Sequence, residues 1–142
     1  MKHEVLIYNK TREKIPKKFI ENVILRALEF LKLKQPVELA VLIVDKNEIQ
    51  RLNNIWRGKN VSVDELSFGL NSRKSALFAK GNINVISLGE IVINSEKIAD
   101  KKHLIKILTH SLLHLLGYNH ENSTVKARKM EELENKILKY VA

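Results

Sequence analysis

Three of the five histidines in this chain of 142 residues lie within residues 110–120. His110 and His114 are four residues apart, so their side chains lie one above the other on the same face if the segment is helical. Gly117 permits that helix to end, because glycine tolerates the left-handed backbone that commonly closes a helix. The chain can then return and bring His120 to the first two histidines. Residue types and spacing together predict a metal site with three imidazole ligands.

The ligand type indicates which class of metal site this is. A structural zinc usually has four protein ligands, often thiolates, whereas a catalytic zinc has three and keeps one position for water. The chain contains no cysteine, so we expect one Zn²⁺ per chain at an open site, although imidazoles also bind nickel and other transition ions. His103 lies on the same helical face but about 10 Å from His110 along the helix, too far to share the ion.

A long helix is needed to carry the first two histidines, and the sequence predicts one after Ser95, a plausible cap. Its apolar residues lie roughly opposite His110 and His114, so the apolar side anchors the helix while the histidine side faces a cleft. These residues are Leu104, Ile105, Leu108, Leu112, Leu115 and Leu116. A final helix is predicted to start at Ser123 or Thr124. Its apolar stripe is Val125, Met130, Leu133, Ile137 and Val141.

Apolar runs predict the strands on which these helices pack. Val37–Val44 is nearly all apolar and β-branched, which is typical of a central strand buried on both faces. Val5–Tyr8 and Leu88–Asn94 are shorter apolar runs, and Glu65–Leu70 alternates apolar and small or polar residues. Residues 71–87 mix basic, apolar and turn-forming residues, so we expect a long loop there with an optional edge strand.

Two further helices are predicted between these strands. The first begins near Pro16 and cannot continue through Pro36. The second begins with Asp45 and Glu48 in the form of a capping box and runs to Trp56. The loop that follows places Arg57 and Lys59 beside a glycine, which suits close approach to phosphate oxygens. An ordinary basic surface loop explains these residues equally simply, and from the loop alone it is the favoured interpretation.

Length and charge bound the class of protein. The length fits a single domain over residues 1–142. The net charge of +9 and the pI near 9.8 favour a polyanionic partner, although scattered basic residues also fit a solvated surface. The N-terminus has no signal-peptide pattern, and no run of about 18 apolar residues could span a membrane. We therefore expect a cytoplasmic protein without membrane association. The sequence does not indicate an oligomeric state.

Four segments in this order and at these separations resemble the YbeY family of bacterial ribosomal-RNA maturation factors. They are Arg57–Lys59, Val63–Phe68, Leu88–Ile91 and His110–His120. The resemblance spans most of the chain. It implies an α+β fold, with a mixed four-stranded sheet packed with about five helices and a metal site at the end of a long helix.

The resemblance also implies a function: a zinc-dependent, single-strand-specific endoribonuclease that acts in 3'-end processing of 16S ribosomal RNA and in maturation of the small ribosomal subunit. The expected partners are therefore single-stranded RNA and that subunit. The family's ligands match His110, His114 and His120, and its functionally important arginine matches Arg57. His114 and Arg57 are thus the expected catalytic residues. Residues expected to bind or position RNA are Lys59, Asp64 and Ser67.

The expected reaction is hydrolysis of an RNA phosphodiester by a water that the metal activates. Arg57 would stabilise the charge that develops on the phosphoryl oxygens. The sequence assigns no general base.

The chain departs from the family pattern at several positions. Ser111 replaces a glycine and is small enough to leave the ligand geometry alone. Asn119 replaces an aspartate, which removes a charge near the metal and changes the basicity expected of the site. The segment Val63–Leu66 carries Glu65 where the family has valine.

Two alternative functions stay open. One is a ribosome assembly factor without catalysis, in which the metal only braces the helix turn. The other is a zinc peptidase, but the peptidase signature has its general base, a glutamate, at the position of Ser111.

Overall fold

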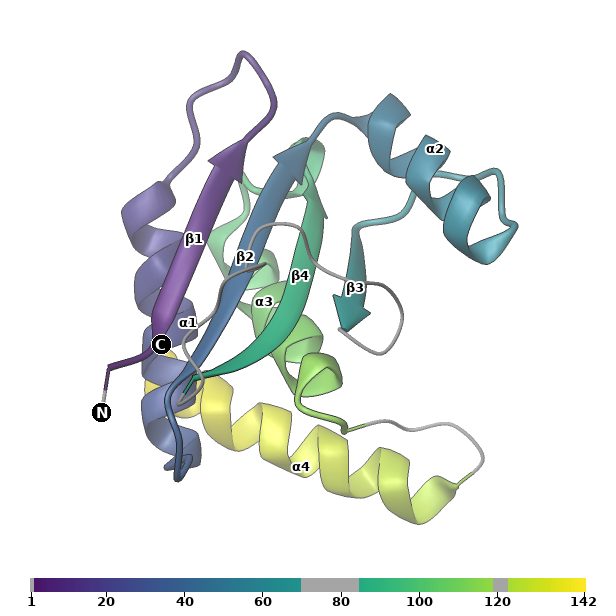
Figure 1. Cartoon of the computed structure of the whole chain (residues 1–142). Coiled ribbons are helices and arrows are strands. Elements are labelled where there is room, and N and C mark those ends of the chain that lie inside the picture. Colours follow the sequence, from purple (N-terminus) through teal and green to yellow (C-terminus); the bar gives the residue numbers. More distant parts are fainter. Residues whose placement is uncertain (1, 70–84, 119–122) are drawn as a thin grey trace.

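The computed structural model describes residues 2–69, 85–118 and 123–142. Among them a four-stranded mixed sheet lies at the centre (Figure 1), with the strand order β1-β2-β4-β3. Its strands are β1 (Glu4–Asn9), β2 (Val37–Val44), β3 (Glu65–Gly69) and β4 (Ile86–Asn94). β1, β2 and β4 are parallel, while β3 pairs antiparallel with β4 at one edge. The mixed four-stranded sheet expected from the resemblance is confirmed.

β2 has the bounds that its apolar run predicts, and all its residues except Leu42 are buried. Alternate side chains point to opposite faces of a strand, so a strand whose only polar residue is Glu38 requires cover on both sides of the sheet. Leu39, Val41 and Ile43 belong to one core cluster, and Val44 belongs to a second. The prediction of a central strand buried on both faces is therefore confirmed.

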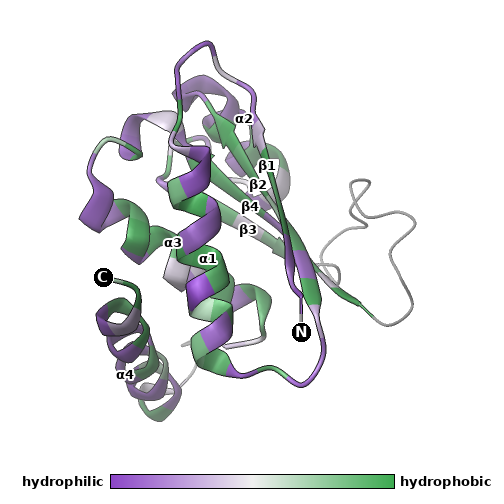
Figure 2. Cartoon of the chain, turned by 90° about the vertical axis from the view of Figure 1, so that its left-hand side faces the viewer, coloured by the Kyte–Doolittle hydropathy of each residue, from purple (hydrophilic) through white to green (hydrophobic). Residues whose placement is uncertain are grey.

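Helices provide that cover. The described part of the chain forms four α-helices and one short 3₁₀ helix, which are α1 (Lys17–Leu31), α2 (Lys46–Arg57), η2 (Ser95–Lys97), α3 (Lys101–Leu115) and α4 (Thr124–Val141). Apolar residues of α1, α3 and α4 form the larger cluster on one face of the sheet, whereas Ile49 of α2 belongs to the smaller cluster on the other. Figure 2 shows α1, α3 and α4 together on one side of the sheet, each with mixed hydrophobic and hydrophilic residues.

The start of the histidine-bearing helix differs from the prediction. Ser95 does not cap α3, because residues 95–97 form η2, whose N-cap is Asn94. The cap of α3 lies five residues later, where the Asp100 side chain accepts a hydrogen bond of 3.2 Å from the backbone N–H of His103. Both aspartate and serine are good N-cap residues, so local sequence did not exclude the later start.

Two other expectations need correction. Ile86 and Ser87, placed in the loop with the optional edge strand, are the first residues of β4. Residues 71–84 of that loop lie outside the described residues, as does Leu70 of the predicted strand Glu65–Leu70. Val125 of the predicted α4 stripe is 59% exposed, because it lies in the first turn of α4. The capping of α4 by Ser123, which accepts from the N–H of Lys126, is confirmed.

Gly89 permits a bulge in β4. The register with β2 shifts between Glu38 and Leu39, and Gly89 has a φ of +119°. A Cβ atom there would lie 2.1 Å from the carbonyl oxygen of Phe68 in the neighbouring strand. Only glycine allows β3 to approach β4 this closely.

Candidate metal centre

The end of α3 has the geometry that its glycine predicts. Gly117 has a φ of +98°, and its N–H donates to the carbonyl of His114 over 3.0 Å. The N–H of Tyr118 donates to the carbonyl of Leu113, also over 3.0 Å. Such bonds satisfy the last carbonyls of a helix and turn the chain away from its axis. Asn119 and His120 follow outside the described residues, so the third ligand stays a prediction.

His110 and His114 lie side by side on α3. Their Nε2 atoms are 2.9 Å apart, and the rings meet edge to face with centroids separated by 4.4 Å. Both histidines are partly exposed, whereas the three residues between them on α3, residues 111–113, are buried. The prediction that the two side chains share one helix face is confirmed, and their binding of one ion stays a prediction.

Glu134 of α4 contacts the other nitrogen of the first ring. Its Oε1 atom pairs with Nδ1 of His110. The Glu134 side chain is only 12% exposed, against 32% for His110. A mostly buried carboxylate therefore lies behind the imidazole, on the side away from His114.

A cavity of about 230 Å³ opens beside this pair of residues. It is lined by histidines and a lysine of α3, by a carboxylate of α4, and by carboxylates of β3 and of the loop before β3. The lining residues are Asp64, Glu65, His103, Lys106, Ile107, His110 and Glu134. The cleft expected on the histidine side of the helix is thus present.

Ser111 and Glu65, two positions at which the chain departs from the family pattern, contact each other. The hydroxyl of Ser111 donates to Oε2 of Glu65 over 2.7 Å, and the hydroxyl of Ser67 donates to the same oxygen over 3.1 Å. Ser111 is completely buried. The carboxylate of Glu65 on β3 therefore contacts α3 through Ser111, the residue that follows the candidate ligand His110 in the sequence.

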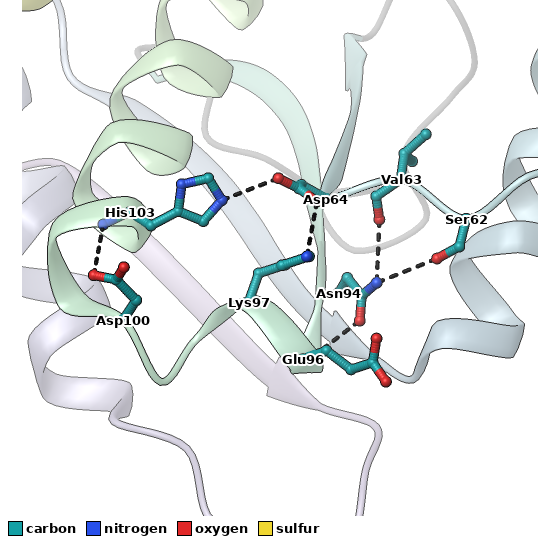
Figure 3. Close-up of polar contacts among 8 residues, drawn as sticks. All are labelled: Ser62, Val63, Asp64, Asn94, Glu96, Lys97, Asp100 and His103. Atoms are coloured by element: carbon teal, nitrogen blue, oxygen red, sulfur yellow. Dashed lines mark hydrogen bonds and ion pairs between the residues drawn. The ribbon is translucent and has the colours of Figure 1, made fainter.

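Asp64 also lines the cavity. Its carboxylate is 3.0 Å from Nε2 of His103 and 3.7 Å from Nζ of Lys97 (Figure 3). Asn94 fixes this loop, because its amide donates to the hydroxyl of Ser62 and to the carbonyl of Val63, each over 3.2 Å. His103 is thus engaged with Asp64, which agrees with its exclusion from the predicted ligand set.

The structure does not bring all the predicted site residues together. Arg57 is the last residue of α2, the helix on the opposite face of the sheet from α3, and its side chain is exposed. Lys59 is exposed in the loop that follows. The described contacts place Asp64 and Ser67 near α3, but they do not join Arg57 to the two histidines.

The donor chemistry fits a transition ion. Two ligands of one tetrahedral zinc at 2.0–2.1 Å are about 3.3 Å apart, close to the 2.9 Å between the two Nε2 atoms. Among the described residues no group of three histidine, aspartate or glutamate side chains is placed to hold an ion. The described residues therefore supply two ligands of the predicted set.

Sequence reasoning missed Glu134, although the sequence contains a signal for it. Met130, Ile137 and Val141 are the buried residues of α4, and Glu134 lies in the same row with 9% exposure. A charged residue within an apolar helical stripe is rare unless it is paired. That interruption could have marked Glu134 as a residue with a buried partner.

An α+β fold with a mixed sheet and a helix that presents histidines beside a cavity is typical of a small enzyme. Comparison with known proteins is more specific: a family model described as Endoribonuclease YbeY matches residues 6–142. The chain therefore belongs to the YbeY family of endoribonucleases, which are hydrolases. The resemblance seen in the sequence is confirmed.

Individual relatives agree with the family model. The Endoribonuclease YbeY of Syntrophomonas wolfei is 37% identical over 131 residues, covering 84% of this chain and 82% of the relative. That of a Sulfurihydrogenibium species is 32% identical over 139 residues, covering 96% and 91%. A solution structure of a Thermotoga maritima protein has the same fold, with a TM-score of 0.59 and 23% identity over 96% of this chain and 88% of that one.

No helix in the described part of the chain has the length and apolar character needed to cross a membrane.

Proposed function

We propose that this protein is a zinc-dependent endoribonuclease that cuts single-stranded RNA and acts in 3'-end processing of 16S ribosomal RNA in the cytoplasm. Membership of the YbeY family supports the reaction class. The observation that carries the metal dependence is the convergence of the His110 and His114 Nε2 atoms at 2.9 Å beside the cavity. His120 is the third ligand in this proposal. Nickel or another transition ion would fit the same nitrogen donors.

The three histidines would hold the ion, and His110 also lines the cavity. When bound, the ion supplies Lewis acidity, both for activation of a water and for polarisation of a phosphoryl oxygen. Lys106 lines the same cavity and attracts the phosphate through its positive charge. A single strand suits this site better than a duplex, because its backbone can bend to bring one phosphate into a recess.

Arg57 and Lys59 would bind the RNA on the other side of β3. β3 is an edge strand among the described residues, with α3 packed on one of its faces and α2 on the other. RNA that passes over this edge would reach both the cavity and the basic loop after α2. In that arrangement Asp64 and Ser67 orient groups at the rim of the cavity through their contacts with His103 and Glu65.

The experiment that tests the proposal is metal analysis of the purified protein combined with cleavage of a single-stranded RNA substrate. We expect about one transition ion per chain, cleavage that a chelator abolishes and added zinc restores, and no activity in His114→Ala. Cleavage that persists at full rate in metal-free protein would contradict the metal dependence. The assembly-factor alternative would be supported instead if the wild type does not cleave RNA and the His114→Ala variant still binds the ribosome.

A further inference from the structure

We propose that Glu134 is a positioning residue for the metal ligand His110: it accepts the Nδ1 proton and thereby directs the Nε2 lone pair toward the ion. This inference rests on the proposed function, since it requires an ion at His110 and His114. It assigns a role in the site to α4, the C-terminal helix, which supplies none of the predicted ligands.

The location of Glu134 indicates that its contact with His110 is more than incidental. It lies between Met130 and Ile137 in the buried row of α4, and it is itself buried, with 9% exposure against 2% for Met130 and 0% for Ile137. A carboxylate loses free energy on burial unless it is paired and hydrogen-bonded. The Nδ1 atom of His110 provides such a pairing.

The contact fixes the tautomer of the ring. An ionised carboxylate has only acceptor oxygens, so the proton of a neutral His110 must lie on Nδ1. Nε2 then carries the lone pair, and Nε2 is the atom that lies 2.9 Å from Nε2 of His114. The opposite tautomer would direct an N–H at the position of the ion. Glu134 thus selects the one neutral form of His110 that can bind a metal through Nε2.

The contact also fixes the orientation of the ring and raises its affinity for the ion. Ligating histidines in metalloproteins commonly donate their second nitrogen to a carboxylate, which makes the ligand more basic, and removal of such a partner costs about 10–100-fold in metal affinity. The α3–α4 contact through His110 and Glu134 has this arrangement. Metal affinity should therefore depend on a residue that does not touch the ion.

Two substitutions distinguish the effect of the charge of Glu134 from the effect of its volume. The measured quantity is zinc affinity, determined by competition with a chromophoric chelator. Glu134→Gln keeps the size and one acceptor oxygen but loses the charge, so we expect affinity to fall about tenfold. Glu134→Leu removes the acceptor and fits the apolar row, so we expect a loss of about 100-fold. Glu132→Gln removes the same charge from an exposed position of the same helix and should leave the affinity unchanged.

A spectroscopic readout distinguishes positioning from general stability. The visible absorption of the cobalt-substituted protein reports ligand geometry, and we expect it to change in Glu134→Leu and to stay constant in Glu132→Gln. If wild type binds an ion and both Glu134 variants bind it equally tightly with unchanged spectra, Glu134 only packs against α3 and the inference is wrong. If Glu134→Leu does not fold, the near-isosteric Glu134→Gln decides alone. If wild type binds no transition ion, the proposed metal site itself fails, and the role of Glu134 with it.

Discussion

His110 and His114 share a helix face with His103. Single alanine substitutions can show which of these histidines bind the metal. We expect alanine at His110, His114 or His120 to weaken metal binding by more than the 10–100-fold that loss of an outer hydrogen-bond partner costs. His103→Ala is the matched control, because His103 contacts Asp64 rather than the histidine pair. Metal content per chain after dialysis against a weak chelator measures the effect. An equal loss in His103→Ala would show that the ligand set is wrong.

Arg57 tests whether the basic loop contributes to catalysis or only to RNA binding. If its guanidinium contacts the reacting phosphate, Arg57→Ala should keep the metal and the fold but lose roughly 2.7–4 kcal/mol of transition-state stabilisation, about 10²–10³ in kcat. Arg57→Lys should recover only part of this, because lysine lacks the planar fork. Arg51→Ala, which removes the same charge from the same helix, is the control.

The fold makes this test decisive, because α2 lies on the opposite face of the sheet from α3. Cleavage by Arg57→Ala that is unchanged at saturating RNA, with metal content verified, would assign Arg57 to binding of the strand and would remove it from the catalytic residues.

Ser111 and Glu65 test how α3 is held against β3. Their 2.7 Å hydrogen bond joins a completely buried hydroxyl to a carboxylate, and hydrogen bonds to charged groups contribute about 1.5–3 kcal/mol. In a double-mutant cycle with Ser111→Ala and Glu65→Ala, we therefore expect a coupling of roughly 1–2 kcal/mol in the free energy of unfolding, measured by urea denaturation of metal-free protein. Ser67→Ala, which removes the longer bond to the same oxygen, should couple less. Additive effects of the two substitutions would show that the contact does not stabilise the packing.

The same elements show how far local sequence determines the fold. The bounds of β2 follow from one run that is apolar except for Glu38, and the end of α3 follows from Gly117, because both depend on residues close together in the sequence. The start of α3 depends on a choice between two suitable caps, Ser95 and Asp100, which the local sequence leaves undecided.

The contacts that complete the candidate site depend on tertiary packing. Glu134 meets His110 across 24 residues, and Glu65 meets Ser111 across 46. Periodicity within one helix or strand predicts which side is buried, but not which residue of another element it faces. The histidine pair was therefore predictable from sequence, whereas the sequence could mark Glu134 only as a residue with a buried partner and not as the partner of His110.

At the scale of the whole molecule the charge of +9 governs the approach of RNA. Binding of single-stranded RNA releases counterions, so the logarithm of affinity should fall linearly with the logarithm of salt concentration, by about 0.7 for each phosphate neutralised. The fluorescence of Trp56 offers a direct measurement, because it is the one tryptophan of the sequence and is 47% exposed next to Arg57. Its ring also meets that of Phe68 edge-on with centroids 6.0 Å apart, which ties the signal to β3.

Variants of the basic loop should change the salt dependence in a defined way. Arg57→Ala and Lys59→Ala should each reduce the slope by about 0.7 if the side chain neutralises one phosphate. Lys18→Ala, an exposed lysine on α1 that forms an ion pair with Glu21, is the control and should leave the slope unchanged. RNA affinity that does not vary with salt would contradict the electrostatic account. A salt-dependent affinity whose slope is the same in all three variants would place the RNA elsewhere on the surface and separate the basic loop from the path of the strand to the cavity.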